Sequence, residues 1–375
     1  MGRRFLAMDA QARVQKLLDQ LVETDQETGV QVAAYLRGEP VVDAHAGLAD
    51  PATGRTVDHQ TLFNAWSTGK GSTSTVVHVL VERGLLHYET PVAEYWPQFG
   101  AHGKDRITIA HVLTHTAGVP QAPEGITVGD LGDWDGMCAR IADLPVLWEP
   151  GTATGYHALT YGYILGEVVR RVTGRPIAQV LCEHVAGPLG IADDLFLGVP
   201  AEQHDRVARL EDGNWVATMA RRPADSLFFT AAPHSIQPSA ELGNRSDYLT
   251  VDLPCAGTMT AHAAARMYAA LACDVDGVRL ISPRRTDLLS TIATAEVDRV
   301  LGVPVPKGLG YFLGLPETGG RASAFGCKGS GGSIAFADPG NDFAFAFMHN
   351  RMAAPPADLA SRVANEVRTA LGIAG

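Results

Sequence analysis

The sequence predicts an α/β (α+β) protein in which an antiparallel sheet, built from both ends of the chain and flanked by helices, carries a large and mostly helical inserted lobe. Strand-like segments occur near the two ends, at residues 29–46 and 311–349, whereas the stretch between them has mainly helical periodicity. We therefore expect a sheet lobe of residues 1–64 plus 275–375 and a helical lobe of residues 65–274. A binding or active site should lie in the cleft between the lobes, where such sites are common.

The first part of the chain predicts a helix followed by a β-hairpin. Residues 10–23 place apolar side chains at helical spacing, which indicates an amphipathic helix. Residues 29–36 and 40–46 are two short apolar runs, and the three residues between them include a glycine. This arrangement is typical of two antiparallel strands joined by a tight turn.

The last part of the chain predicts a strand meander and a final helix. Four short segments, at residues 311–315, 323–326, 333–338 and 343–349, alternate with turns rich in Gly, Pro and Asn. Residues 357–371 then show the spacing of a helix. We expect these strands to share one sheet with the N-terminal hairpin.

The long middle of the chain predicts several helices and one irregular segment. Helical patterns cover residues 72–86, 107–116, 159–173 and 261–273. Residues 199–254 are the least regular part of the sequence. Long irregular segments in compact domains often line binding sites, although linkers have the same appearance.

The composition limits the partners and the location of the protein. The 375 residues are 46% hydrophobic and 19% charged, as in an ordinary globular protein, and the net charge of −11 comes with no basic run. This charge argues against nucleic acid and against an anionic membrane as a partner. We find no secretory signal and no apolar run long enough to span a bilayer. The five cysteines have no C-x-x-C spacing, so we expect reduced thiols and a cytoplasmic protein.

A Ser-x-x-Lys sequence, Ser67 to Lys70, precedes the first helix of the middle region. Residues three apart lie on the same face of a helix, so the two side chains should point the same way. A serine hydroxyl becomes a nucleophile when a neighbouring group assists removal of its proton. The chain has five lysines, and Lys70 alone has a serine three residues upstream. The alternative is that Ser67 only caps the helix.

Two other patterns argue against common hydrolase types. His111 and His115 have the i, i+4 spacing of zinc ligands, but Val112 occupies the position where zinc proteases carry their glutamate. The sequence also lacks the G-x-S-x-G elbow of α/β-hydrolases. We therefore expect neither a metal nor another cofactor.

A second polar candidate lies on the Gly- and Thr-rich loop of residues 150–158, which leads into the predicted helix at 159–173. Tyr156 stands beside Gly155 on this loop, where its hydroxyl could be presented to a ligand. The alternative is a tyrosine half buried at the surface. The loop alone does not distinguish the two.

Taken together, separate stretches of the sequence resemble one family. Ser67-Thr68-Gly69-Lys70, residues 151–161 and residues 325–339 resemble, in order and spacing, the motifs of class C serine β-lactamases and of their relatives, the family VIII carboxylesterases. Residues 109–119 are also typical of this group. The resemblance extends over most of the chain, and it implies a β-lactamase-like fold with penicillin-binding proteins as further relatives.

The resemblance implies a role for several side chains. Ser67 would be the nucleophile, Tyr156 the general base, and Lys70 the cation beside both. A free tyrosine keeps its proton up to a pH of about 10, so a tyrosine base at neutral pH needs a nearby positive charge. The backbone N–H groups of Ser67 and Ser330 would form the oxyanion hole. The residues expected to contact substrate are Trp66, His157, Cys327, Gly329 and Gly331.

Two departures from the β-lactamase motifs favour ester chemistry. The third position of the Tyr-x-Asn motif is Ala158, and the Lys-Thr-Gly motif reads Cys327-Lys328-Gly329. Because successive side chains of a strand alternate between faces, Lys328 should point away from the side that Cys327 faces. Cys327 would then be a small apolar wall residue or, alternatively, a reactive thiol.

The sequence thus predicts a serine acyl hydrolase of the carboxylesterase type that cleaves small esters through an acyl-enzyme on Ser67. A transacylase of secondary metabolism, passing the acyl group to an alcohol or amine, would use the same residues. β-Lactamase or D-peptidase activity and a non-catalytic binding protein are further alternatives. The partner would be a small-molecule ester or acyl donor, and no motif indicates an oligomeric state.

Overall fold

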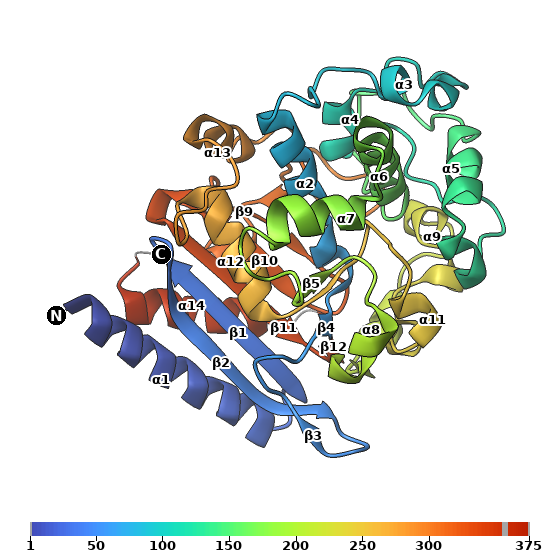
Figure 1. Ribbon diagram of the computed structural model, residues 1–375. Coiled ribbons are helices and arrows are strands. Elements are labelled where there is room, and N and C mark those ends of the chain that lie inside the picture. The colour runs from blue at the N-terminus through green and yellow to red at the C-terminus, as the bar shows by residue number, and fades with distance from the viewer. Residues whose placement is uncertain (1, 355–358, 374–375) are drawn as a thin grey trace.

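The computed structural model describes residues 2–354 and 359–373 and contains a seven-stranded sheet with helices on both faces (Figure 1). The strand order is β3-β2-β1-β11-β10-β9-β8. The strands are β1 (Gly29–Leu36), β2 (Glu39–Asp50), β3 (Arg55–Thr56), β8 (Phe312–Leu313), β9 (Phe325–Lys328), β10 (Ile334–Asp338) and β11 (Phe343–His349). This architecture confirms the predicted fold class.

The two ends of the chain meet in the middle of this sheet. Strand β1 pairs antiparallel with β2 on one side and with β11 on the other, so that Val32 lies between Ala44 and Phe347. We expected the N-terminal hairpin and the C-terminal meander to share a sheet, and they do. Strand β2 continues four residues beyond its predicted end, to Asp50, and β9 begins two residues later than predicted and runs directly into the Gly-rich turn after Lys328.

The two faces of the sheet are covered by different helices. Phe343, Phe345 and Phe347 of β11 pack with helices α1 (Gly2–Glu23) and α14 (Leu359–Leu371), whereas the alternating small side chains Ala344 and Ala346 belong to the other core. Helix α12 (Ala261–Ala272) lies on that second face, against β1, β10 and β11. The short alanine side chains let this Ala-rich helix approach the strands closely. The first two residues of the predicted final helix, 357 and 358, lie outside the described residues.

A group of helices lies beside the sheet (Figure 1). Its main members are α2 (Lys70–Glu82), α5 (Trp134–Ala142) and α6 (Thr160–Thr173), with α4 (Ile109–Leu113) capped by the side chain of Thr108. Shorter helices are α3 (Val92–Tyr95), α7 (Ile177–Leu181), α8 (Trp215–Met219), α9 (Leu227–Ala231), α10 (Ala240–Gly243), α11 (Ser246–Leu249) and α13 (Pro283–Leu289). Small strand pairs involve β4 (Phe63–Asn64), β5 (Leu195–Phe196), β6 (Glu211–Asp212), β7 (Thr258–Met259) and β12 (Arg351–Met352).

The division of the chain into two lobes stays a prediction. Helix α12 lies within the range 65–274 that we expected in the helical lobe, yet it packs on the sheet. Its apolar residues therefore belong to the sheet layer. At this point the expected boundary at residue 274 assigns α12 to the helical lobe, whereas its contacts are with the sheet.

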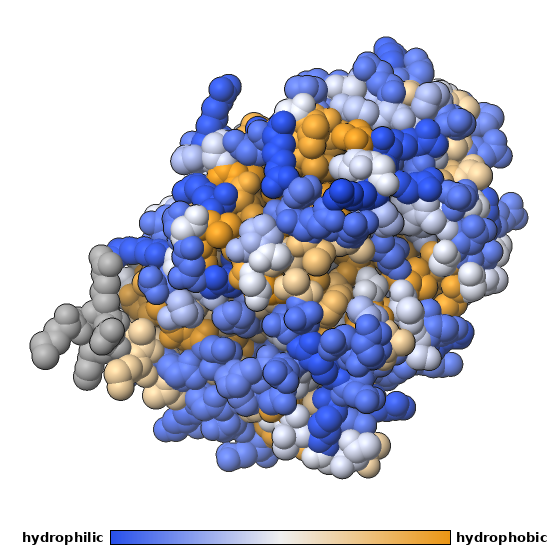
Figure 2. Space-filling view, in the orientation of Figure 1, coloured by the Kyte–Doolittle hydropathy of each residue, from blue (hydrophilic) through white to orange (hydrophobic). Residues whose placement is uncertain are grey.

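The face of the molecule that Figure 2 shows is largely polar. Hydrophilic residues cover most of the face in Figure 2, with hydrophobic residues visible between them in several places. None of the described helices is long and apolar enough to cross a membrane.

Candidate active site

Ser67 lies on a single 3-10 turn, Trp66–Gly69, which immediately precedes α2. Lys70 is the first residue of α2, so Ser67 and Lys70 occupy successive turns rather than one helix. The turn packs closely against the backbone at Ala256, since a Cβ added to Gly69 would lie only 2.2 Å from backbone atoms of that residue. Trp66 adopts the left-handed region, with φ of 49°, which is rare for a non-glycine residue. This tight turn fixes the position of the Ser67 hydroxyl.

The ammonium group of Lys70 is buried against Ser67. Its Nζ lies 3.3 Å from Ser67 Oγ and donates to the carbonyl oxygens of Ala158 at 2.8 Å and Cys255 at 2.9 Å. It also lies 4.9 Å from the centroid of the Tyr156 ring. Within the described ranges, Lys70 forms no ion pair with a carboxylate. The positive charge is therefore held beside Ser67 and Tyr156 without an acidic partner.

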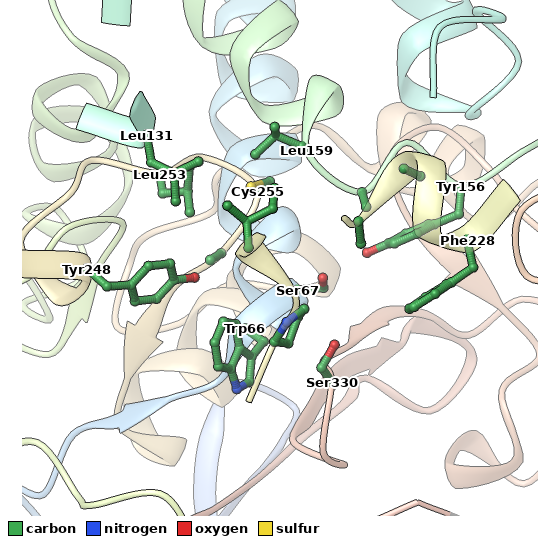
Figure 3. Close-up of a pocket in the computed structure, with 16 residues that line it drawn as sticks. Trp66, Ser67, Leu131, Tyr156, Leu159, Phe228, Tyr248, Leu253, Cys255 and Ser330 are labelled. Carbon is green, nitrogen blue, oxygen red and sulfur yellow. The ribbon is translucent and has the colours of Figure 1, made fainter. Parts of the chain in front are cut away.

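Tyr156 lies on the predicted loop, packed with Ala231 and Val300. Figure 3 shows its hydroxyl pointing towards the hydroxyls of Ser67 and Ser330. In the part of the chain that the structure describes, the Tyr156 hydroxyl makes no hydrogen bond. Catalytic hydrogen bonds often tighten only when substrate is present, so this geometry is that of an open site.

The Gly-rich turn after β9 lies against the Ser67 turn. A Cβ on Gly329 would lie 2.0 Å from the carbonyl oxygen of Ala65, so the two turns touch through their backbones. Thr68 Oγ1 reinforces the contact by donating to Ser333 O at 2.9 Å. The backbone N–H groups of Ser67 and Ser330 donate to no other group among the described residues. Both donors are thus available for an oxyanion.

The loop of Tyr156 is held by a buried ion pair that our sequence analysis missed. Lys307 Nζ and Asp298 Oδ2 are 2.8 Å apart, and both side chains have an exposed fraction of 0%. Lys307 also donates to Thr154 Oγ1 at 3.0 Å. Burial lowers the pKa of Lys307, although the Asp298 carboxylate acts in the opposite direction. The other carboxylate oxygen, Asp298 Oδ1, accepts the backbone N–H groups of Tyr156, Val300 and Leu301 at 3.0, 2.9 and 2.8 Å.

His157, which we expected to bind substrate, is instead part of the core. Its Nδ1 donates to Gly155 O at 2.6 Å and its Nε2 accepts the N–H of Val119 at 3.1 Å, so both ring nitrogens are used. Burial lowers the pKa of His157 to about 4. The expected substrate contact is therefore wrong, because the side chain after Tyr156 points into the protein.

The two histidines considered as zinc ligands have separate structural partners. His111 Nδ1 accepts the N–H of Thr108, and His115 Nδ1 accepts the N–H of His157 at 3.0 Å. The His115 ring also stacks on Tyr161 with 4.8 Å between centroids. Among the described residues, no group of three or more His, Cys, Asp or Glu side chains is arranged to hold a metal ion.

The side chains after Gly326 also differ from our expectation. Cys327 is buried under the carbonyl of Gly310, and burial raises the pKa of its thiol to about 12, which argues against a reactive thiolate. Lys328 points away and pairs with Glu317, as strand alternation predicted. Gly331, at φ of 94°, packs against Met352. Cys327, Gly329 and Gly331 are not among the residues that line the pocket beside Ser67, and their expected substrate contacts stay a prediction.

The pocket beside Ser67 has apolar walls (Figure 3). Trp66, Ser67, Tyr156 and Ser330 line it as expected. Most of the remaining wall comes from outside the motifs, including Leu131, Phe228, Ile236, Leu253 and Cys255. Several of these residues belong to the irregular segment 199–254, so this segment contributes to the wall of the pocket. No Asp, Glu, Lys or Arg is among the lining residues.

Known proteins with the same fold and related sequences identify the family. Residues 14–368 match the family described as Beta-lactamase. The chain is 39% identical over 348 residues to "Esterase/beta-lactamase LipL" of Mycobacterium tuberculosis (strain ATCC 25618 / H37Rv), covering 87% of this chain and 78% of that protein. The structure of a family VIII carboxylesterase superposes with a TM-score of 0.87 at 33% identity, covering 96% of this chain and 97% of the other. A penicillin-binding protein homologue from Caulobacter crescentus superposes with a TM-score of 0.85 at 33% identity, covering 97% and 98% of the two chains. The chain therefore belongs to the beta-lactamase family.

Proposed function

We propose that this protein is a serine ester hydrolase that cleaves small, predominantly apolar esters through an acyl-enzyme on Ser67. The observation that carries the proposal is the contact of Lys70 Nζ with Ser67 Oγ at 3.3 Å, at the mouth of an apolar pocket that Tyr156 and Ser330 also line. The relatives described as an esterase/β-lactamase and as a family VIII carboxylesterase support the same reaction class.

The proposed acylation step uses Tyr156 as the base. Tyr156 accepts the proton of Ser67 Oγ as this oxygen bonds to the carbonyl carbon, and the ammonium of Lys70 stabilises the negative charge on the base. The N–H groups of Ser67 and Ser330 bind the oxyanion that forms. When the ester C–O bond breaks, the proton passes from Tyr156 to the leaving alkoxide.

Deacylation reverses these roles. A water molecule gives its proton to Tyr156 as its oxygen bonds to the acyl carbon. The bond between the acyl carbon and Ser67 Oγ then breaks, and Ser67 takes the proton back. An alcohol or amine in place of water would give acyl transfer, the alternative with the same residues.

The pocket supports esters rather than β-lactams as substrates. At the position of the cation in the Lys-Thr-Gly motif of β-lactamases this chain has Cys327, and the neighbouring Lys328 is paired with Glu317. At the position of the amide-binding Asn of β-lactamases, this chain has Ala158, which lines the pocket and carries no side-chain amide. Apolar esters need neither group. A cytoplasmic location is part of the proposal, supported by the five free cysteines.

The test is the intact mass of the protein after mixing with p-nitrophenyl butyrate, with and without an added alcohol. Wild-type protein should gain one butyryl group on Ser67, located by digestion, and lose it to water. Ser67→Ala should form no adduct and release no p-nitrophenol. Release by Ser67→Ala at the wild-type rate would overturn the assignment. Ester formation from an added alcohol would favour the transacylase.

A further inference from the structure

Tyr248 places a further polar group in the pocket, away from the reacting serine. It lies on α11 in the irregular segment, and its side chain lines the pocket with an exposed fraction of only 7%. Figure 3 shows Tyr156 and Ser330 on one side of Ser67 and the Tyr248 hydroxyl on the other, directed into the pocket.

The Tyr248 ring is fixed relative to Ser67. It packs on the indole of Trp66, with 5.4 Å between ring centroids and an interplanar angle of 41°. Trp66 directly precedes Ser67 and is itself held in the left-handed backbone region. A group bound by Tyr248 would therefore have a defined position relative to the nucleophile.

The Tyr248 hydroxyl has no hydrogen-bond partner among the described residues. Buried tyrosine hydroxyls usually find one, because leaving such a group unpaired is unfavourable. Three other buried tyrosines follow that rule, whereas the hydroxyl of the fully buried Tyr268 has no partner among the described residues. Tyr161 OH lies 2.7 Å from Ser74 Oγ, Tyr163 OH lies 2.6 Å from Leu131 O, and Tyr311 OH lies 2.9 Å from Thr75 Oγ1.

The surroundings define the chemistry of the missing partner. Leu131, Leu253 and Cys255 line the same part of the pocket, and no charged side chain lines it. An ionised group beside Tyr248 would thus be desolvated without a counter-ion in the pocket wall, since the ammonium of Lys70 is held by Ser67 and by two carbonyl oxygens. Burial also raises the pKa of Tyr248 well above its ordinary value, so the hydroxyl stays neutral and can donate. A neutral acceptor, such as a ketone or ether oxygen, fits this environment.

We infer that Tyr248 is a specificity residue that selects esters carrying a neutral hydrogen-bond acceptor on an otherwise apolar chain, at a distance from the scissile carbonyl. This inference rests on the proposed ester hydrolysis at Ser67. A site built to hydrogen-bond a substrate discriminates against the analogue that lacks the group, because its own polar atom is then left unpaired.

The experiment compares matched esters on wild-type protein and on Tyr248→Phe. One series of p-nitrophenyl esters moves a single ketone along a straight acyl chain, each beside the unsubstituted ester of the same length. A second series moves the ketone along the alcohol part of butyrate esters, with hydrolysis followed by acid release. The two series together cover either orientation of the ester in the pocket.

We expect wild-type protein to prefer the oxo-ester at one chain position in one of the series. In Tyr248→Phe, kcat/KM for that oxo-ester should fall by about 3- to 10-fold, the size expected of one neutral hydrogen bond. The value for the matched plain ester should stay the same or rise. Tyr35→Phe, which removes a buried hydroxyl in the sheet, should leave the wild-type preference intact.

Two results would overturn the inference. One is the absence of a preference for any oxo-ester in both series, and the other is an equal loss on plain and oxo-esters in Tyr248→Phe. Either result leaves the proposed function standing if plain esters still acylate Ser67. Failure of plain esters to acylate Ser67 would instead reject the proposed function itself.

Discussion

Two buried lysines near Tyr156 have opposite environments. Lys307 is paired with Asp298 at 2.8 Å, whereas Lys70 contacts one hydroxyl and two carbonyl oxygens and, within the described residues, no carboxylate. Both side chains are almost fully buried, with exposed fractions of 0% and 3%. The charge of Lys307 is neutralised by Asp298 and helps to hold the loop of Tyr156. The charge of Lys70 stays available to Ser67.

This contrast follows from the energetics of buried charge. A buried ion pair gains Coulomb energy that offsets desolvation, and it is fragile when only one partner is removed. A buried ammonium held by neutral dipoles keeps a net positive field around it, which favours negative charge on a neighbouring group. Lys307 therefore stabilises the folded loop and does not act on the reacting atoms. Lys70 acts on the reacting atoms in the proposed mechanism.

The largest expected effect is that of Lys70→Met on catalysis. Loss of the ammonium should lower kcat for p-nitrophenyl butyrate by about 10²–10⁴-fold, the usual contribution of an acid–base group. Its effect on the unfolding free energy should be smaller than that of Lys307→Met, because it leaves no buried carboxylate unpaired. The exposed Lys16→Met is the matched control and should retain full activity. Near-normal kcat in Lys70→Met would remove the distinction between the two lysines.

The second effect is on stability. Lys307→Met should lower the unfolding free energy by about 3–5 kcal/mol, because Asp298 is left as an uncompensated buried charge. Adding Asp298→Asn should restore much of this loss, since the amide oxygen can still accept the N–H of Tyr156 without carrying a charge. Urea unfolding of the wild type, the single variant and the double variant measures both changes. A double variant no more stable than Lys307→Met would argue against the ion-pair explanation.

The third effect is the loss of stability in mild acid. Burial, with help from Lys307 and Lys70, lowers the pKa of His157 to about 4, against about 6.5 in an unfolded chain. Between these values the unfolded state binds a proton that the folded state does not. The unfolding free energy should therefore fall as the pH falls from about 6.5, by up to about 1.4 kcal/mol per pH unit for each such group.

Urea unfolding at several pH values from 7.5 to 5 would measure this slope. Most carboxylates titrate below this window, so histidines should dominate the change. Burial lowers the pKa of His78 to about 3, which adds to the slope with the same sign. A stability that does not change between pH 6.5 and 5 would contradict the buried neutral state of these rings.

The smallest effect concerns Cys327. It tests whether the charge of Lys70 is enough to ionise this buried thiol. Lys70 acts to lower the pKa of this thiol, but burial dominates and raises it to about 12. Iodoacetamide at pH 8 should therefore alkylate the exposed Cys182 in the native protein, leave Cys327 unmodified and leave activity unchanged. Mass spectrometry of digests measures both sites. Inactivation that follows alkylation of Cys327 would mean that the thiol is accessible and ionised.

Features that depend on local spacing were predicted from the sequence, whereas features that depend on contacts between distant residues were not. The hairpin, the meander and the Ser67–Lys70 contact depend on spacings of a few residues, which local periodicity describes well. His157 was wrong as a substrate contact because it follows a motif residue and yet lies fully in the core, with both ring nitrogens used. Asp298 and Lys307 carry no motif, and Lys307 lies 153 residues from Thr154, so nothing local marks their meeting.

The amino-acid order by itself determined the helical and strand periods, the pairing of serine with lysine one turn apart, and the family motifs. Tertiary structure alone decided which buried lysine received a carboxylate partner, which side chains formed the pocket wall, and that the Tyr248 hydroxyl faces this pocket without a partner among the described residues. The physical reason is that burial and charge compensation depend on atoms brought together from distant parts of the chain. Local backbone preference, in contrast, depends on neighbours that the sequence already places side by side.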